Sequence, residues 1–372
     1  MFIEIHPDEA KFLDSVREFV ANEVLPNTRA WEEATQFPDE IWPRLGELGL
    51  LSIVLPRDRG GRGLSCAAYC EAVRELAKGD PALAMNVAAI NALVVAHIDQ
   101  FGTPEQKEKY LPGVIRGDIK LAWGLTEPDA GSDARRVKTV AEPIADRPGH
   151  FRLNGKKMFI TNAGKADLIV MIARTGEKDL SAFLVETDQP GFTNVYRIHT
   201  VGVSASYTTG FDLVDALGWH TPCRFEEAIG LLYQGRLGIA AMAVGIAEKA
   251  LEEAVEYSKG REQFNRRLAD MQSIQNMIAD SAMEVEASRL LVRNGAKMYD
   301  MGLPVVTEAS YAKLFASETA MRVTNRALQI HGGRGMTREF LIEKLWRDAK
   351  LTEIGEGASE IQRLVIAKQI LK

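Results

Sequence analysis

Hydrophobic residues recur every three or four positions along the first third of the chain. Phe12, Val16, Phe19 and Val20 follow this spacing and would share one face of a helix. The pattern continues to about residue 120, with the glycine-rich stretch 57–63 (RDRGGRG) as a turn between helices. No strand pattern precedes that stretch and no Gly-Lys-Ser or Gly-Lys-Thr follows it, so it predicts a loop and not a phosphate site. The sequence therefore predicts an N-terminal helical domain over residues 1–120.

The hydrophobic period changes between residues 121 and 225. Apolar and β-branched runs at 158–161 (MFIT), 168–172 (LIVMI) and 182–185 (AFLV) lie between clusters of Gly, Pro, Asn and Asp. Short runs bounded by turn residues are typical of strands. Helical periods return at 237–257, 268–301 and 307–330. The expected fold class is α+β, with a middle β domain over residues 121–225 and a C-terminal helical domain over residues 226–372.

Composition and charge exclude several classes of partner. The chain has 372 residues, with 45 Lys and Arg against 51 Asp and Glu, and a formal net charge of −6. The charges are mixed along the chain, so no nucleic-acid partner is expected. The sequence MFIEIHPDEAKF at the start has no basic residues followed by an apolar run, and we expect no signal peptide. The longest apolar run, 87–98, is too short to cross a bilayer, so no membrane partner is expected.

The chain contains three cysteines. Cys66 and Cys70 lie one turn apart on an expected helix, and Cys223 is distant in sequence. No further His or Cys set at ligand spacing completes a metal site around them. We expect reduced, structural cysteines, no bound metal and a cytoplasmic protein.

Two glycine-containing segments are candidates for chemistry. Glu356 lies between Gly355 and Gly357, where the backbone can turn sharply and a ligand can come close. That arrangement suits a catalytic base, although an acidic residue in a glycine turn is, taken alone, more often a solvated loop tip or a helix cap. The segment 123–133 (WGLTEPDAGSD) offers hydroxyls, glycines and backbone donors. Such a loop can follow the polar edge of a planar ring, or can be an ordinary polar turn.

These segments, with three others, resemble the motifs of the acyl-CoA dehydrogenase family in the same order along the chain. The segment 123–133 is similar to the first family signature, and 329–336 (QIHGGRGM), with Glu339, Lys344 and Asp348 at matching offsets, is similar to the second. Further matches are 159–162 (FITN), 261–264 (REQF) with Gln272, and 356–363 (EGASEIQR). The resemblance covers essentially the whole chain and agrees with the helical, β, helical layout.

The resemblance implies an FAD-dependent enzyme that oxidises an acyl-CoA to the trans-2-enoyl-CoA. Members of the family pass the α-proton to a carboxylate and the β-hydrogen, as hydride, to flavin N5. By resemblance Glu356 is the base, and its backbone N–H binds the thioester oxygen together with a ribityl hydroxyl of FAD. An apolar, substrate-filled pocket would raise the pKa of this carboxylate toward the working range. The expected electron acceptor is an electron-transfer flavoprotein.

The resemblance also implies residues that bind the cofactor and the substrate. Those expected at FAD come from the two signatures, the 159–162 and 261–272 segments and the start of the last helix: Trp123, Leu125, Thr126, Gly131, Ser132, Phe159, Thr161, Arg261, Phe264, Gln272, Gln329, Gly332, Gly333, Ala358 and Glu360. Those expected at the substrate are Ser132, Tyr233, Arg236 and Gly357. The segments with Arg261 and Gln329 resemble ones that complete the FAD site of a neighbouring subunit, which implies a homotetramer built as a dimer of dimers.

The chain departs from the family pattern at several positions. Phe159 stands where most members have Trp, Ala358 replaces a common Thr, and Tyr233 takes a place that is often acidic. Arg135 and Arg136 replace small residues and are expected to face water. The stretch 214–227 lacks the usual Val-Pro and Leu-Leu-Gly sequences, and nothing in the sequence assigns it a function.

Gly355 and the scaffold itself leave alternatives open. Gly355 stands where several relatives carry Tyr or Leu, so it provides space beside the acyl group, for branched or cyclic substrates, or only lets the backbone turn. The same scaffold carries desulfinase- or lyase-type enzymes with a structural FAD, and dehydrogenases of carrier-protein-bound acyl groups. Glu356 argues against monooxygenases, which do not use this base, and against nitroalkane oxidases, where Asp would be expected.

Overall fold

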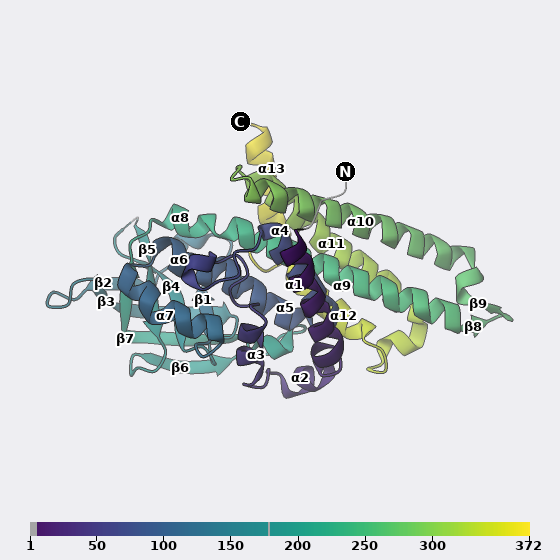
Figure 1. Ribbon diagram of the computed structural model, residues 1–372, viewed down its shortest axis with the longest axis horizontal. Coiled ribbons are helices and arrows are strands. Elements are labelled where there is room, and N and C mark those ends of the chain that lie inside the picture. The colour runs from purple at the N-terminus through teal and green to yellow at the C-terminus, as the bar shows by residue number, and fades with distance from the viewer. Residues whose placement is uncertain (1–5, 178) are drawn as a thin grey trace.

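The computed structural model describes residues 6–177 and 179–372 (Figure 1). The expectation about a leader sequence falls partly on residues 1–5, which lie outside the described part. In Figure 1 a β-sheet forms the left of the molecule, long helices form the right, and the N-terminal helices extend from the middle over the left. The expected order of helical, β and helical regions is confirmed. The α-helices described in the first region are α1 (Pro7–Phe19), α2 (Thr28–Ala34), α3 (Ile41–Glu47), α4 (Cys66–Gly79), α5 (Pro81–Ala89), α6 (Ala96–Phe101) and α7 (Pro104–Arg116).

The N-terminal helices form where an apolar face follows a capping residue. On α1, Phe12, Val16 and Phe19 are buried, as the spacing predicts. The Ser65 hydroxyl accepts the N–H of Ala68 at the start of α4, and the Asp80 carboxylate accepts that of Leu83 at the start of α5. These side chains satisfy N–H groups that have no partner within the helix. The caps fix where α4 and α5 begin, and both helices pack against α9 (Leu232–Gly260).

The middle region is a seven-stranded sheet. β4 pairs in parallel with β1 and antiparallel with β5, while β3 and β7 run antiparallel through the centre. Since β5 also pairs with β7, the strands β4, β2, β3, β7 and β5 close into a ring. Leu153, Met171, Phe183 and Phe211 fill its interior. The strands are β1 (Leu121–Gly124), β2 (Val140–Pro143), β3 (His150–Ile160), β4 (Leu168–Arg174), β5 (Leu180–Glu186), β6 (Phe192–Arg197) and β7 (Thr209–Thr221).

The C-terminal region is built around one central helix. α9 packs against α4, α5, α10, α11 and α12, and most of its first half is buried. A two-stranded hairpin joins α9 to α10 and projects from the right-hand end of the molecule in Figure 1. The elements are α8 (Phe225–Gly230), α9 (Leu232–Gly260), β8 (Glu262–Gln263), β9 (Arg266–Arg267), α10 (Gln272–Asp300), α11 (Val306–His331), α12 (Ile342–Thr352) and α13 (Ser359–Ile370).

Two expected helix limits differ from the structure. The helix expected from residue 268 begins at Gln272, because Met271 has extended backbone angles (φ −95°, ψ 125°) and ends a separate short turn. The hairpin before it was not predicted, since strands of two residues give no periodic pattern. The helix expected over 237–257 is longer, at Leu232–Gly260. It includes residues 233–236, so Tyr233 and Arg236 lie on a helix.

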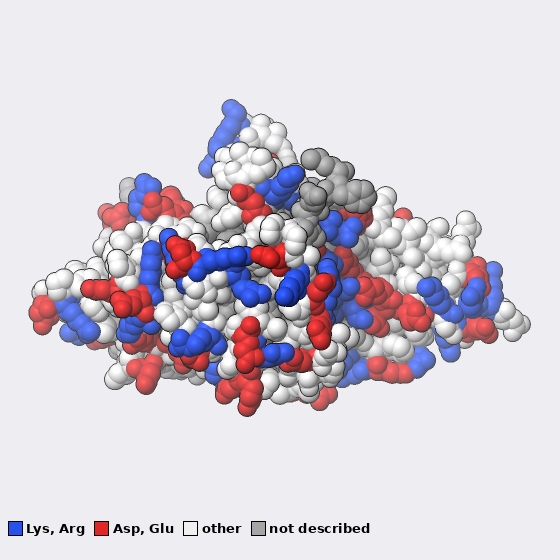
Figure 2. Space-filling view, viewed as in Figure 1, with Lys and Arg blue, Asp and Glu red and all other residues white. Residues whose placement is uncertain are grey.

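Two segments are long and apolar enough to cross a membrane by length and composition alone. They are Pro81–Phe101 and Phe225–Gly260, and 94% and 78% of their most apolar windows are buried inside the protein. Buried core helices meet the same criterion, so this is weak evidence for a membrane span. Figure 2 shows Lys and Arg interspersed with Asp and Glu over the visible face, which agrees with the mixed charges of the sequence.

A buried group of charges ties the three regions together. Lys344 on α12 contacts the carboxylates of Asp348 (2.6 Å) and Asp80 (3.3 Å). Asp348 also accepts the backbone N–H of Val203, in the loop before β7, at 2.6 Å. Burial by itself would lower the pKa of Lys344, but the two carboxylates outweigh it and raise the pKa. Every member of the group therefore has a partner, and the group holds α12 against α5 and the sheet.

Candidate active site

Glu356 lies in the turn between α12 and α13. The N–H groups of Ile354 and Gly355 both donate to the carbonyl of Leu351, which closes the end of α12. Glu356 then takes a left-handed conformation (φ 52°), followed by Gly357 (φ 102°). A residue other than glycine in this region costs about 1–3 kcal/mol and is often found at functional sites. Glu356 and Gly357 make the turn, so the structure gives no support to a turning role for Gly355, whose φ is not positive.

The carboxylate of Glu356 points at the glycine face of α9. Its Oε2 is buried and has no hydrogen-bond partner among the described residues, although the residue as a whole is partly exposed. A Cβ added to Gly235 would lie 2.0 Å from this oxygen, so a larger residue at that position would force the carboxylate to move from this place. Burial raises the pKa of Glu356 to about 7, although Arg236 and Lys313 act to lower it. A carboxylate with a pKa near neutrality and a free oxygen is suited to accept a proton.

Two buried cations hold the backbone of this turn. Lys313 on α11 donates from Nζ to the carbonyl of Gly357 at 2.8 Å, and Gln362 donates to the same oxygen at 2.9 Å. Arg236 on α9 makes a long hydrogen bond, 3.5 Å, to the carbonyl of Glu356. Within the described part of the chain neither Arg236 nor Lys313 forms an ion pair with a carboxylate. Their charges are therefore left to act on the nearby carboxylate of Glu356.

The backbone of Glu356 also presents a donor. Among residues 6–177 and 179–372, no protein group accepts its N–H or those of Gly357 and Ala358, whereas the N–H groups of Gly355 and Ser359, which flank these three residues, are both used. One residue thus offers a basic carboxylate and an unused N–H. That combination can remove a proton next to a carbonyl group while it stabilises the negative charge that develops on the oxygen.

The segment that begins at Trp123 is anchored by a buried ion pair. Lys157 on β3 contacts the Glu127 carboxylate (2.9 Å) and donates to the carbonyls of Leu125 (3.1 Å) and Ile172 (2.8 Å). Burial lowers the pKa of Lys157 to about 8, and Glu127 opposes that change. The N–H of Met158 donates to the carbonyl of Thr126 at 3.0 Å. The structure therefore brings the 123–133 and 159–162 segments together, and sequence analysis missed the Lys157–Glu127 pair that does so.

The surface formed by these two segments fits a flat, polar ring. Phe159 is 55% exposed and has a positive φ (58°), and Trp123 has a buried Nε1 with no partner. Thr126 and Thr161 are partly exposed beside them, and Gly131 and Ser132 are exposed. The side chain of Leu125 is buried, and its carbonyl accepts a hydrogen bond from Lys157, so its expected place at FAD stays a prediction. An exposed ring, an unpaired indole donor and open backbone are what a bound isoalloxazine would use.

Six of the other expected FAD residues lie at the opposite end of the chain's fold from this surface. Arg261, Phe264 and Gln272 lie on the hairpin and at the start of α10, and all are exposed, Phe264 by 89%. Gln329, Gly332 and Gly333 end α11 at the same end of the bundle, where Tyr257 stacks on His331 with ring centroids 4.2 Å apart. A Cβ added to Gly332 or Gly333 would meet nothing within 4 Å. In Figure 1 this end and the sheet are on opposite sides of the molecule.

The expected substrate residues divide in the same way. Arg236 lies over the ring of Tyr233, 5.4 Å from its centroid, and Gly357 is adjacent to both Arg236 and Gln362. Ser132 comes from the loop after β1, on the middle region. Ala358 precedes α13 without a side-chain cap, and Glu360 is exposed in its first turn. Arg135 is exposed as expected, and it pairs with Glu226 at 2.6 Å.

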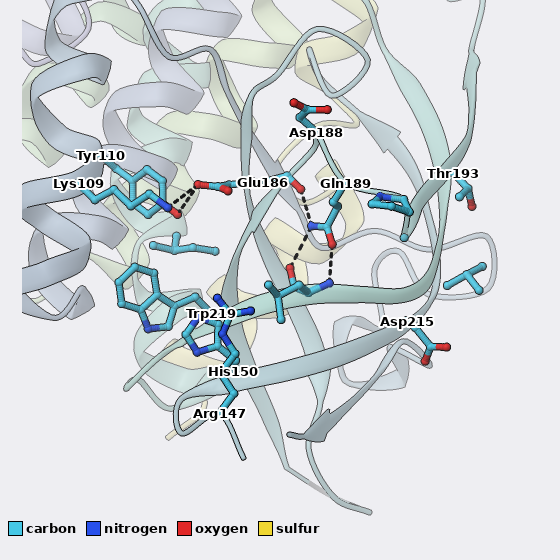
Figure 3. A pocket seen from close by; sticks show the side chains of 15 residues that line it. Lys109, Tyr110, Arg147, His150, Glu186, Asp188, Gln189, Thr193, Asp215 and Trp219 are labelled. Carbon is cyan, nitrogen blue, oxygen red and sulfur yellow. Dashed lines mark hydrogen bonds and ion pairs between the residues drawn. The ribbon is translucent and has the colours of Figure 1, made fainter. Parts of the chain in front are cut away.

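A separate hollow of about 670 Å³ lies at the other end of the sheet (Figure 3). Trp219 stacks on His150 in its wall (interplanar angle 13°), and Gln189 bonds the backbone of Leu217. The divergent stretch 214–227 contributes several of its residues, but none of the expected site residues lines it. His150 and Phe159 lie near opposite ends of β3, which is about 30 Å for an extended strand. The hollow is thus distinct from the Glu356 site.

No metal site stands out beside these features. In the described ranges no three His, Cys, Asp or Glu side chains are grouped as metal ligands, and Cys66, Cys70 and Cys223 are buried and unpaired with one another by disulfides.

Comparison with known proteins identifies the class to which the fold and this site belong. The N-terminal, middle and C-terminal domains of acyl-CoA dehydrogenases match residues 6–118, 122–215 and 225–371. A short-chain specific acyl-CoA dehydrogenase from Clostridium acetobutylicum is 40% identical over 96% of both chains. The structure of butyryl-CoA dehydrogenase from Megasphaera elsdenii matches 100% of both chains, with 36% identity and a TM-score of 0.96.

The chain therefore belongs to the acyl-CoA dehydrogenase family. The resemblance noted from the motifs is confirmed, and so are the class of enzyme and the cofactor, FAD. A glutaryl-CoA dehydrogenase from Mycobacterium smegmatis, solved in complex with FADH2, is similar over 98% of this chain and 95% of its own, with 29% identity and a TM-score of 0.93. The individual site residues stay predictions from sequence, now with a place in the structure.

Proposed function

We propose that this protein dehydrogenates short-chain acyl-CoA thioesters at the α and β carbons, with Glu356 as the base that takes the α-proton. The observation that carries this proposal is the buried Oε2 of Glu356, which has no partner and belongs to a carboxylate whose pKa is raised to about 7. A structural carboxylate in such a place would be paired, because an unpaired buried charge is costly.

The residues of the chain divide the chemical work between them. The N–H of Glu356 donates to the thioester oxygen, and this bond strengthens as negative charge develops there. The carboxylate of the same residue removes the α-proton, and Gly235 leaves it room to reach the substrate. Bound FAD supplies the acceptor for the β-hydrogen and its two electrons. Trp123, Thr126 and Phe159 orient the ring, and the apolar helix core around α9 excludes water.

The FAD site is proposed to be shared between subunits in a homotetramer, a dimer of dimers. Support comes from Arg261, Phe264 and Gln329, which are exposed at the end of the bundle that lies away from the Trp123 surface. Dilution of the purified protein until it dissociates should then release FAD, measured together by light scattering and flavin fluorescence. A stable monomer that kept its full FAD content would refute the shared site.

The short-chain preference and the electron acceptor rest on relatives. The matched enzymes from C. acetobutylicum and M. elsdenii are named short-chain specific and butyryl-CoA dehydrogenases. A relative from Acetobacterium woodii, 37% identical over 92% of both chains, is named a subunit of a caffeyl-CoA reductase–Etf complex. We therefore assign an electron-transfer flavoprotein as the partner that exchanges electrons with the flavin.

Mixing the protein with a panel of acyl-CoAs without oxygen tests the proposal. Butyryl-CoA should bleach the flavin absorbance and yield the trans-2-enoyl product, and long-chain thioesters should do so more slowly. A flavin that no acyl-CoA bleaches would contradict the proposal and favour a desulfinase- or lyase-type enzyme with a structural FAD. Bleaching by carrier-protein thioesters alone would change the substrate and keep the reaction.

A second candidate is the same reaction run in reverse. An acryloyl-CoA reductase (NADH) from Anaerotignum propionicum is 38% identical over 96% of this chain and 92% of its own. In that direction protonated Glu356 returns the α-proton. Protein with reduced FAD is mixed with crotonyl-CoA, and protein with oxidised FAD is mixed with butyryl-CoA. The two rates of change in flavin absorbance show which direction is faster.

A further inference from the structure

Lys313 is a buried cation close to the candidate base. It lies on α11, where its residue is 0% exposed, and its Nζ donates to the carbonyl of Gly357, next to Glu356. Within the described residues it forms no ion pair, in contrast to the buried Lys157 and Lys344, which contact carboxylates directly. A buried ammonium without such a contact is costly, and burial lowers the pKa of Lys313 to about 8, so the side chain is still charged at neutral pH and can act on a nearby acidic group.

Gln362 donates to the same oxygen as Lys313, the carbonyl oxygen of Gly357. Its Nε2 is 2.9 Å from the Gly357 carbonyl, and Lys313 Nζ is 2.8 Å from it. One neutral donor already satisfies the carbonyl, so hydrogen bonding by itself does not require a lysine. The difference between the two donors is the positive charge, and the nearby group that can use it is the carboxylate of Glu356.

The charged groups around Lys313 come from each element that packs there. Arg236 approaches from α9, Glu353 and Glu356 from the turn after α12, and Glu360 from α13. Glu353 pairs with Lys350 at 2.5 Å, and Glu360 is exposed to water. Glu356 is thus the acidic group whose charge depends most on Lys313 and Arg236.

We infer that Lys313 is a positioning residue for the α-proton transfer: it fixes the Gly357 carbonyl and keeps the carboxylate of Glu356 ionised. This inference rests on the proposed function. The sign of the effect follows from the contacts. Burial raises the pKa of Glu356 to about 7, and the charge of Lys313 opposes that rise. Removal of the charge therefore raises the pKa further, and a larger fraction of Glu356 is protonated and inactive at neutral pH.

The test compares three variants of the FAD-containing protein, with wild type as the reference. Lys313→Met removes the charge at similar length, Lys313→Arg keeps a charge, and Gln362→Met removes only the neutral donor to the same carbonyl. For each, the rate of flavin reduction by butyryl-CoA is followed without oxygen over about pH 6 to 9. Circular dichroism and flavin content show whether each variant is folded, and Lys313→Gln replaces the methionine variant if that one is not.

The inference predicts a shift of the pH midpoint to higher pH, by about one unit, in Lys313→Met. Below that midpoint its rate is about tenfold lower than in wild type, and the deficit shrinks as the pH rises. Gln362→Met lowers the rate without moving the midpoint, and Lys313→Arg keeps the midpoint near that of wild type. Equal loss in Lys313→Met and Gln362→Met at every pH, with no shift, would overturn the inference and leave Lys313 a backbone donor only.

A second readout does not depend on turnover. Unfolding temperatures are measured at several pH values for wild type and Glu356→Gln, and for Lys313→Met and the double variant Lys313→Met/Glu356→Gln. Within each pair, the difference in unfolding temperature reports the ionisation of Glu356. In the Lys313→Met background its transition should move to higher pH by the same amount. If wild type fails to reduce its flavin with any acyl-CoA, the proposed function fails, while an unshifted stability profile contradicts the role of Lys313 by itself.

Discussion

Two buried groups of charges in this protein differ in one respect. Around Lys344 each charge has a partner, with Asp348 at 2.6 Å and Asp80 at 3.3 Å. Around Glu356 the two cations bind backbone carbonyls, and one carboxylate oxygen has no partner in the part of the chain that the structure describes. The first group joins helices and sheet, and its charges are satisfied. The second leaves a carboxylate oxygen unpaired at the candidate active site. Both groups are buried, so they differ in whether the charges are paired, and an unpaired titratable group is the one that marks a candidate for chemistry.

The largest effect is expected from Glu356→Gln. Glutamine has nearly the same shape, fits beside Gly235 and cannot accept the α-proton. Turnover with butyryl-CoA should fall by about 10²- to 10⁴-fold, while FAD content and the circular dichroism spectrum stay as in wild type. Stopped-flow flavin reduction measures this directly. A variant that reduces its flavin at nearly the wild-type rate would remove Glu356 from the role of base.

Lys344→Met should reduce stability instead. The change leaves Asp348 and Asp80 buried without their cation, which costs about 3–5 kcal/mol when one partner of a buried pair is lost. The unfolding temperature should fall strongly. Lys350→Met is a matched control on the same helix, since Lys350 pairs with Glu353 at 2.5 Å but is largely exposed, and its loss should cost less than about 1 kcal/mol. Equal falls in unfolding temperature for Lys344→Met and Lys350→Met would contradict a structural role for the buried charges around Lys344.

The pH dependence of stability should carry the signature of the unpaired carboxylate. The pKa of Glu356 rises from 4.5 to about 7 on folding, so the folded protein holds a proton that the unfolded chain has released between these values. Wild type should lose stability relative to Glu356→Gln as the pH rises from about 4.5 to 7, by up to about 3 kcal/mol, with little further change above. Unfolding temperatures measured at several pH values test this. A difference between wild type and Glu356→Gln that does not change with pH would show that folding does not raise the pKa of Glu356.

The smallest expected effect concerns Gly355, beside the base. A Cβ there would meet only Leu351, at 3.5 Å and beyond, and the backbone does not need glycine, so the interpretation of Gly355 as space is the better supported one. Gly355→Tyr should therefore select against isobutyryl-CoA relative to butyryl-CoA by about 1–3 kcal/mol. The ratio of the two kcat/KM values measures this. An unchanged ratio in a folded, FAD-containing variant would mean that this space is not used by the acyl group.

The sequence predicts the architecture well where hydrophobic periods are long. The periods predict the three long C-terminal helices, although two of their limits differ, and the burial of Phe12, Val16 and Phe19 follows from their spacing. β7 (Thr209–Thr221) was missed, because its second half, in the stretch 214–227, has no regular alternation. The hairpin at 262–267 is too short to give a pattern.

The motifs of the candidate site could be predicted from the sequence, but the residues that hold these motifs in place could not. Glu356 and the segment from Trp123 come from local sequence. Gly235, Lys157 and Lys313 depend on contacts between elements far apart in the chain: Lys313 meets Gly357 across 44 residues, and Lys157 meets Glu127 across 30. A lysine within an apolar strand or helix is the one local signal that could have identified Lys157 and Lys313, because a buried lysine has to have a partner or a function.

The most direct test of the central claim is the pH dependence of flavin reduction in wild type, with saturating butyryl-CoA and no oxygen. If the unpaired carboxylate of Glu356 takes the α-proton, the rate constant should rise about tenfold per pH unit on the acid side and level off near or above pH 7, where burial places its pKa. A rate constant that stays the same from about pH 5.5 to 9, in protein that stays folded, would contradict this account.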